Sequence, residues 1–157
     1  MNTCDLCDLH EARVRILDLP LRDYGGRLAF DGLVSTIKAY EDNSLVREAV
    51  AEAGNGRVLV IDGGGSTRRA MLGDLLAAKA VENGWAGVVV YGAIRDSGAI
   101  GAMELGVKAL GTCPRKTDKL GQGARDVVVE IGGLVIRPGD WLCADEDGVV
   151  LADEVLR

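Results

Sequence analysis

The feature that most constrains the fold is an alternation of apolar strands and helices along residues 57–112. The apolar runs "RVLVID" (57–62), "GVVVYG" (87–92) and "VKALGT" (107–112) predict buried strands. The segments at 72–84 and 97–105 predict the helices between them. Because parallel neighbours in a sheet need a crossover connection, and a helix usually supplies it, this run predicts a parallel βαβ core.

The segments on the N-terminal side of this core continue the alternation. "RLAFDGLVSTIKAY" predicts strands at 27–30 and 33–39 on either side of an Asp-Gly pair. "NSLVREAVAEAG" predicts a helix that begins at Asn43 or Ser44 and ends at Gly54. This part of the chain therefore adds one more helix to the core.

The C-terminal third has a different pattern, because short apolar runs alternate with Gly-Gly, Pro-Gly and Asp-Gly turn signals. Strands are expected at 126–131, 134–137, 140–145 and 148–152, after an exposed loop at 112–125. This succession predicts an antiparallel meander. The fold class is therefore α/β, a mixed β/β/α sandwich with a parallel βαβ core and a C-terminal antiparallel meander.

Composition limits the classes of function. The chain has 157 residues, of which 48% are apolar and 27% charged, so a single globular domain over residues 1–157 is expected. No apolar stretch approaches the ~20 residues of a membrane helix, and no signal peptide is visible, so we expect a cytoplasmic protein. The net charge is -6 and basic residues form no stripe, which disfavours direct nucleic-acid binding.

The N-terminus offers an apparent metal motif. Cys4, Cys7 and His10 could form half a zinc site, but the remaining two cysteines lie far apart in the sequence. The simpler interpretation is a short helix that Thr3 caps and that carries the first two cysteines as small apolar residues. The other two are expected to be buried thiols in a reducing compartment.

Several catalytic devices do not fit the sequence. The only histidine, His10, lies outside the core motifs, so a Ser-His-Asp or Cys-His device is not expected. The glycine-rich segment 62–66 lacks the lysine of a phosphate loop, and Arg68 stands where a dinucleotide loop has its third glycine. We expect a tight strand-to-helix connection there. Lys79 and Lys108 are expected to be solvated, which argues against a Schiff-base aldolase.

The most informative pair is Arg95-Asp96, directly after the strand at 87–92. In α/β sheets ligands bind at the carboxyl ends of the strands. The preceding helix begins near Gly73-Asp74-Leu75-Leu76, and its first amides lack partners inside the helix. One helix and one strand separate Asp74 from Arg95, so both should reach the same edge of the sheet. A surface Arg–Asp turn is the alternative.

These groups together would recognise a small carboxylate. A guanidinium binds a carboxylate in a bidentate way, and helix-end amides add charge-assisted bonds. Asp96 would then be free to hold Mg²⁺ or Mn²⁺. Such a cation could chelate a 2-oxo acid and stabilise the enolate that forms when a neighbouring carbon–carbon bond breaks.

The stretch "VLVIDGGGSTRRAMLGDLLAAKAVENGWAGVVVYGAIRD" (58–96) resembles the core of the RraA-like family. That family includes regulators of ribonuclease E activity and 4-hydroxy-4-methyl-2-oxoglutarate aldolases. The similarity extends to "EDNSLV" (41–46), to 105–123 and to the tail at 132–151. The resemblance implies a "swivelling" β/β/α domain and a homotrimer with active sites between subunits.

The resemblance also implies a role for each site residue. The amides of Gly73, Asp74, Leu75 and Leu76 would bind the substrate carboxylate, and Arg95 would bind the substrate and polarise its oxygen. Asp96 would ligate the metal. The side chain of Asp74 would share a proton through metal-bound water. An acidic residue from a neighbouring subunit is also implied, for which Glu104, Asp118 and the C-terminal acidic cluster are candidates.

The function implied is a metal-dependent lyase that cleaves 4-hydroxy-4-methyl-2-oxoglutarate-type 2-oxo acids to pyruvate and also decarboxylates oxaloacetate. The alternative is a protein that regulates ribonuclease E by binding it, without required catalysis. A menaquinone methyltransferase label has been used for the family, but no feature of the sequence requires a methyl-donor site.

Overall fold

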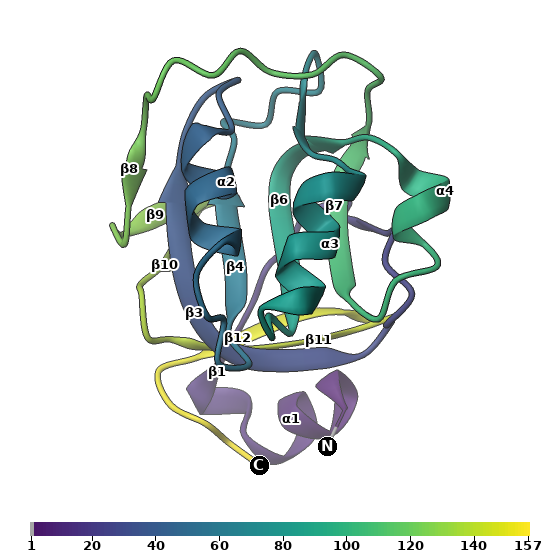
Figure 1. Ribbon diagram of the computed structural model, residues 1–157. Coiled ribbons are helices and arrows are strands. Elements are labelled where there is room, and N and C mark those ends of the chain that lie inside the picture. The colour runs from purple at the N-terminus through teal and green to yellow at the C-terminus, as the bar shows by residue number, and fades with distance from the viewer. Residues whose placement is uncertain (1) are drawn as a thin grey trace.

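The predicted helices and strands occur in the expected order with shifted boundaries, and short strands at 14–16, 22–23, 70–72 and 124–125 are additional. A computed structural model describes residues 2–157 (Figure 1). The helices are α1 Thr3–Leu9, α2 Ser44–Val50, α3 Asp74–Glu82 and α4 Ser97–Ile100, with a 3-10 turn η1 at Glu11–Arg13. The strands are β1 Val14–Ile16, β2 Arg22–Asp23, β3 Phe30–Lys38, β4 Val58–Asp62, β5 Ala70–Leu72, β6 Gly87–Ile94, β7 Gly106–Thr112, β8 Ala124–Arg125, β9 Val129–Ile131, β10 Leu134–Ile136, β11 Trp141–Asp145 and β12 Gly148–Ala152.

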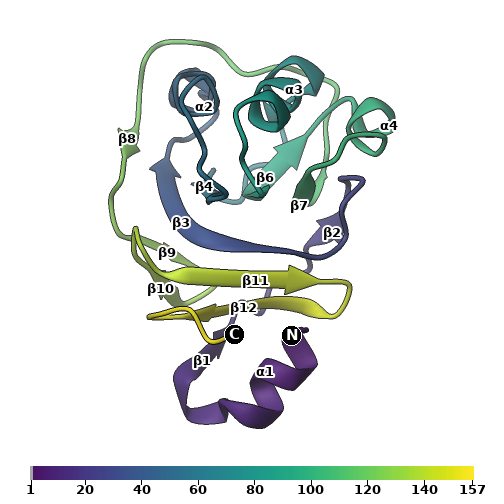
Figure 2. The ribbon, with the colours of Figure 1, turned by 60° about the horizontal axis from the view of Figure 1, so that its bottom comes forward.

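The predicted parallel core is confirmed. Strands β3, β4, β6 and β7 lie side by side in that order, and each neighbouring pair is parallel. Helices α2, α3 and α4 cover one face of this sheet, and the antiparallel strands β11 and β12 lie on the other side (Figure 2). Helix α1 packs outside β11 and β12, so the layers give the expected β/β/α sandwich.

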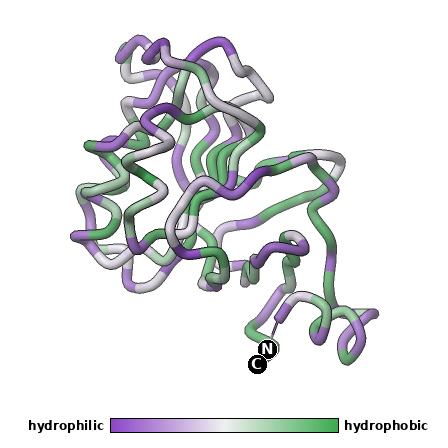
Figure 3. The backbone as a smooth tube through the Cα atoms, turned by 90° about the vertical axis from the view of Figure 1, so that its right-hand side faces the viewer, coloured by the Kyte–Doolittle hydropathy of each residue, from purple (hydrophilic) through white to green (hydrophobic). Residues whose placement is uncertain are grey.

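Strand β4 shows why the central apolar runs are continuous rather than alternating. All five of its residues are buried. Leu59 and Ile61 face the helices, whereas Val58 and Val60 face the antiparallel strands. A strand covered on both faces is apolar along most of its length, as β4 is up to Asp62 at its end, and each buried apolar side chain stabilises the fold by about 1.5–3 kcal/mol. In Figure 3 the hydrophobic stretches accordingly gather in the interior strands and the hydrophilic stretches in the outer turns.

The two strands expected at 27–30 and 33–39 are wrong, because β3 runs unbroken through the Asp-Gly pair. The first half of β3 pairs antiparallel with β11 and the second half parallel with β4. A Cβ at Gly32 would lie 2.2 Å from the carbonyl oxygen of Gly56. The glycine therefore permits a close backbone approach inside a long strand, and no turn is needed to explain it.

The antiparallel C-terminal region consists of two hairpins. Strand β9 pairs with β10 in a small separate sheet, and β11 pairs with both β12 and β3.

None of the helices in residues 2–157 is long and apolar enough to cross a membrane.

The N-terminal helix forms as expected, but Thr3 does not cap it. The side chain of Asn2 accepts the capping hydrogen bond from the Asp5 amide at 2.8 Å. Thr3 is instead buried, and its hydroxyl donates to the Asp145 carboxylate at 2.7 Å. Cys4 in this helix is exposed rather than packed. Thr3 therefore ties α1 to the sheet.

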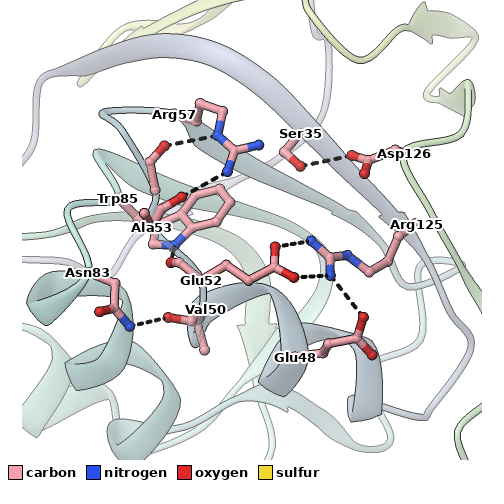
Figure 4. A network of polar contacts seen from close by, with 11 residues as sticks. Ser35, Glu48, Val50, Glu52, Ala53, Arg57, Asn83, Trp85, Arg125 and Asp126 are labelled. Carbon is pink, nitrogen blue, oxygen red and sulfur yellow. Dashed lines mark hydrogen bonds and ion pairs between the residues drawn. The ribbon is translucent and has the colours of Figure 1, made fainter.

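Polar contacts fix α2 to its neighbours (Figure 4). The guanidinium of Arg125 in β8 pairs with Glu48 at 2.9 Å and Glu52 at 2.8 Å. Trp85 is buried in the core under the helices, and its indole nitrogen donates to the carbonyl of Glu52 at 3.2 Å. The Arg57 guanidinium lies 4.7 Å from the Trp85 ring centroid. Trp85 is thus a core-packing residue.

The helix containing α2 was expected to end at Gly54 but ends at Val50. A Cβ at Gly54 would lie 2.6 Å from the Trp85 ring, so this glycine makes room for the indole rather than stopping the helix. The helix expected at 97–105 is likewise shorter and ends at Ile100.

Candidate functional site

The start of α3 and the end of β6 meet, as the sequence predicts. The main-chain amide of Asp74 donates to the Oδ2 atom of Asp96 at 3.0 Å. The Arg95 amide donates to the carbonyl of Leu72 at 2.9 Å, which holds the exit of β6 beside the chain that enters α3. The Nε atom of Arg95 lies 3.9 Å from Asp96 Oδ2. The guanidinium, the carboxylate and the helix start therefore share one corner of the fold.

Gly73 and Asp96 show how closely this corner is built. A Cβ at Gly73 would lie 3.0 Å from Asp96 Oδ2 and 3.3 Å from Arg95 Nε, so a side chain there would press on both groups. Asp96 adopts a left-handed conformation with φ 56°, which is uncommon for a residue other than glycine. Such strain is tolerated where the surrounding structure fixes it, and it often marks functional positions.

An open cleft of about 640 Å³ lies against this corner. Gly73, Asp74, Leu75, Leu76 and Arg95 all line it. Asp96 lies at its edge, through its hydrogen bond to Asp74. The structure thus brings together all six residues that the sequence selected, and their roles stay predictions.

One detail differs from the expected amide cradle. The Asp74 amide is already engaged by Asp96, so the first-turn amides open to a ligand are those of Leu75 and Leu76. Both described contacts of the Asp96 carboxylate fall on Oδ2, which leaves Oδ1 available to a cation. The side chains of Arg95 and Asp96 are each 39% exposed, so solvent and ligands can reach them.

The cleft is basic although the protein is acidic overall. Five cationic side chains line it, against the two carboxylates of Asp74 and Glu82. The cations are Arg47, Lys79, Arg95, Lys116 and Lys119. The chain as a whole has net charge -6, so this excess of positive charge is local to the cleft. A cavity of this kind favours small anions with more than one negative group.

Asp42 holds the loop that carries two of these lysines. The carboxylate of Asp42 is 2% exposed and accepts hydrogen bonds from the amides of Leu120 at 2.8 Å and Gln122 at 3.2 Å. It also accepts from the amide and hydroxyl of Ser44 at 2.9 and 2.6 Å. Burial acts to raise the pKa of Asp42, but these hydrogen bonds outweigh it and lower the pKa to about 2. The carboxylate is therefore ionised and fixes the loop beside the cleft.

Sequence reasoning missed this part of the site. Asp42 was not selected at all, Asn43 was considered only as a helix cap, and Lys116 and Lys119 were placed in an exposed loop. The available signal was the run "EDNS" (41–44), in which two acidic residues and an asparagine precede the serine that begins the helix. That run can mark a carboxylate that satisfies loop amides, but it does not say which loop.

The other motifs weighed in the sequence form no comparable cluster. Among residues 2–157, no three or more histidine, cysteine or acidic side chains, those of Cys4, Cys7 and His10 included, are grouped so that they could hold a metal. The glycine-rich segment 62–66 leads into the short strand β5 rather than directly into a helix. Cys113 is half-buried rather than fully buried, and its thiol donates to the carbonyl of Arg68 at 3.2 Å.

Lys108 is not the solvated lysine that was expected. Its side chain is 3% exposed, and Nζ lies 2.9 Å from the Asp23 carboxylate and 2.7 Å from the Asp145 carbonyl oxygen. Its amine is engaged by these partners and does not line the cleft, which disfavours imine formation with a bound substrate. Lys79 is exposed, as expected, and pairs with Glu82 at 3.3 Å. Glu104 is on the surface, with Arg27 at 3.5 Å.

Relatives of known name match this sequence over nearly its whole length. A protein from Alkalilimnicola ehrlichii named "Putative 4-hydroxy-4-methyl-2-oxoglutarate aldolase" is 57% identical over 150 residues, which cover 96% of this chain and 93% of the relative. A relative of the same name from Aromatoleum aromaticum is 56% identical, with 98% of this chain and 97% of the relative covered.

Two solved structures have nearly the same fold. The RNA-processing inhibitor RraA from Thermus thermophilis superposes with a TM-score of 0.96 at 44% identity and covers 100% of this chain and 95% of its own. A structure from Geobacillus kaustophilus described as S-adenosylmethionine: 2-dimethylmenaquinone methyltransferase gives a TM-score of 0.98 at 52% identity, covering 99% and 97%. The family profile RraA-like, described as Aldolase/RraA, matches residues 3–151. This chain belongs to the RraA-like family.

Proposed function

We propose that the protein is a divalent-metal-dependent lyase that cleaves 4-hydroxy-4-methyl-2-oxoglutarate-type 2-oxo acids to pyruvate. Oxaloacetate decarboxylation is proposed as a second activity of the same site. The observation that carries the proposal is the meeting of Arg95, Asp96 and the first turn of α3 inside a basic cleft. The names of the relatives at 50–57% identity support the aldolase part.

The residues at the edge of the cleft fit a magnesium or manganese ion. Such a cation commonly takes one or two protein carboxylates and completes its shell with water. Asp96 has a free, partly exposed Oδ1 atom, and Asp74 lies one hydrogen bond away, so two carboxylates are at hand. When bound, the cation supplies a Lewis acid that lowers the energy of negative charge on the 2-oxo oxygen.

The chain's own groups bind and orient the substrate. The Arg95 guanidinium and the Leu75 and Leu76 amides bind the C1 carboxylate and 2-oxo oxygen, which places the C3–C4 bond over the cleft. A dianionic substrate then meets Lys116 and Lys119 at its far carboxylate. These lysines favour a dicarboxylic acid over a monocarboxylic one.

The proposed reaction conserves its atoms without another reactant. The C4 hydroxyl loses its proton, the C3–C4 bond breaks, and its electron pair forms the enolate of pyruvate while C4 becomes a carbonyl. The same number of protons returns at C3, which gives two pyruvates from 4-hydroxy-4-methyl-2-oxoglutarate. Asp74, a partly buried carboxylate that lines the cleft, holds the proton between these steps, directly or through water.

The proposal includes a homotrimer with active sites between subunits, in the cytoplasm. Leu75 is 79% exposed beside the open cleft, and Leu120 on the neighbouring loop is 67% exposed. A partner subunit that covers these apolar side chains would also close the cleft to bulk water. The same partner would bring the acidic residue that the family resemblance implies.

The test is pyruvate release from 4-hydroxy-4-methyl-2-oxoglutarate and from oxaloacetate, with and without Mg²⁺. We expect Mg²⁺-dependent release from both acids and a loss of at least about 100-fold in Asp96→Ala, because the metal-binding oxygen is removed. Asp8→Ala, an exposed carboxylate in α1, serves as the matched control and should keep full activity. Undiminished turnover in Asp96→Ala would eliminate the mechanism.

A second candidate function is supported by the close structural likeness to an RNA-processing inhibitor. In this proposal the acidic protein binds ribonuclease E, and its net charge of -6 suits a basic partner surface. A complex that forms on mixing with ribonuclease E, and that survives both Asp96→Ala and chelator, would support it. Failure to form a complex at micromolar concentration would remove it.

A further inference from the structure

One of the residues that line the cleft has a buried amide oxygen without a hydrogen-bond partner among residues 2–157. Asn43 lines the cleft and is 6% exposed. Its Nδ2 atom donates to the carbonyl of Met71 at 3.4 Å, and its main-chain amide donates to the hydroxyl of Thr117 at 3.1 Å. Among residues 2–157, no atom donates to its buried Oδ1. Because a buried acceptor without a donor is costly, this oxygen calls for a partner from outside the chain.

Asn43 does not perform the task that its position suggests. It stands at the N-cap of α2, where an asparagine side chain usually accepts from an amide of the first turn. Its side chain makes no such bond, and the neighbouring Asp42 accepts from the Ser44 amide instead. Asp42 thus frees the Asn43 amide group to point elsewhere.

The position of Asn43 relates it to the candidate site. Met71, whose carbonyl orients the Asn43 amide, lies in β5 two residues before Gly73. Asn43 therefore lines the same cleft as the first turn of α3 and Arg95 and contributes to it from the β3–α2 connection. A ligand held by Arg95 and the α3 amides would extend toward Asn43.

The chemistry of the oxygen selects the ligand group. An amide oxygen accepts a hydrogen bond, so it pairs with a hydroxyl and is repelled by a carboxylate. We propose that Asn43 binds the C4 hydroxyl of the substrate, and that the cleft therefore prefers 4-hydroxy-2-oxo acids to 2-oxo acids without that hydroxyl. This inference rests on the proposed function for the placement of the 2-oxo acid. An amide is not a base, so Asn43 orients the hydroxyl while its proton passes to Asp74 or to water.

The test compares substrates with and without the hydroxyl. Pyruvate release is measured for 4-hydroxy-4-methyl-2-oxoglutarate and for oxaloacetate, in wild type and in Asn43→Ala. We expect kcat/KM for the hydroxy acid to fall by about 10- to 100-fold and that for oxaloacetate to fall by less than about 3-fold. Asn83→Ala is the matched control, because Asn83 also donates to a carbonyl, that of Val50, but does not line the cleft. It should leave the ratio of the two activities unchanged.

A binding measurement separates this inference from the proposed function. Calorimetry with chelator present compares 4-hydroxy-4-methyl-2-oxoglutarate with 4-methyl-2-oxoglutarate, which lacks only the hydroxyl. We expect wild type to bind the hydroxy acid at least about 10-fold more tightly and Asn43→Ala to bind both alike. If no pyruvate forms but this preference holds, the lyase proposal fails and the role of Asn43 stands.

Three results would overturn the inference. One is an equal loss on both substrates, which would make Asn43 only structural. Another is a wild type with no preference for the hydroxy acid, in which case Oδ1 binds water only. The third is a preference that survives in the variant. If Asn43→Ala does not fold, as judged by circular dichroism, Asn43→Leu keeps the volume without the acceptor and must abolish the preference.

Discussion

Replacement of Asp42 by asparagine tests how the cleft loop is held. Each oxygen of the Asp42 carboxylate accepts from two donors, one oxygen from Ser44 and the other from the loop amides of Leu120 and Gln122. An asparagine has one accepting oxygen, so its NH₂ group must face one of these pairs. Two donors then lose their acceptor in a buried position, at about 1–3 kcal/mol each. We expect Asp42→Asn to lower the free energy of unfolding by roughly 3 kcal/mol.

Urea unfolding followed by circular dichroism measures this loss. With a slope of about 2 kcal/mol per molar urea, the midpoint should fall by roughly 1.5 M at pH 7. Asp118→Asn removes an exposed carboxylate from the same loop and should change stability by less than about 0.5 kcal/mol. A loss below about 1 kcal/mol in Asp42→Asn would refute the reasoning.

The pH dependence of this difference has a definite sign. The folded-state pKa of Asp42 is depressed from 3.8 to about 2, so its stabilising effect is fully present above the unfolded value and is lost as the pH falls toward 2. Wild type and Asp42→Asn should therefore converge in stability between about pH 4 and pH 2. A gap that stays constant over this range would contradict the assignment.

Two further substitutions examine the candidate site and the helix layer. Gly73→Ala should lower pyruvate release by at least about 10-fold with less than about 1 kcal/mol lost in stability, because its Cβ would lie 3.0 Å from Asp96 Oδ2. Gly98→Ala is the control and should be active, because a Cβ at Gly98 meets nothing within 4 Å. Equal activity of the two variants would count against the site. Arg125→Ala should cost about 1 kcal/mol of unfolding free energy in low salt and less at 1 M salt, since it loses its ion pairs with Glu48 of α2 and with Glu52 just after the helix. Arg27→Ala, with one exposed 3.5 Å pair, is the control, and an equal effect would remove the role given to Arg125.

The meeting of Arg95 and Asp96 with α3 was predictable because it follows from topology. Once the run from 57 to 112 is recognised as parallel strands with crossover helices, a helix start and the next strand's exit must reach the same edge of the sheet. The apolar runs show this clearly, since strands buried on both faces carry little else. No distance was needed to select these residues.

The opposite wall of the cleft could not be predicted in the same way. Lys116 and Lys119 reach it through hydrogen bonds between Asp42 and a loop about 80 residues further along the chain. No periodic pattern relates such segments, because a single carboxylate and a few loop amides decide the contact. The break predicted at the Asp-Gly pair in β3 was wrong for a related reason. Gly32 is a glycine because the backbone of Gly56 lies close to it, and no local sequence pattern reveals that contact.

The hydrogen bond from the Asp74 amide to Asp96 makes the opening of α3 and the end of β6 one rigid unit. A side chain that is already immobilised loses no rotamer freedom when a ligand arrives, a saving of about 0.5–1.5 kcal/mol per side chain. Part of the affinity for a bound ion is therefore determined while the protein folds. Loosening the helix start should weaken binding even if every liganding atom is retained.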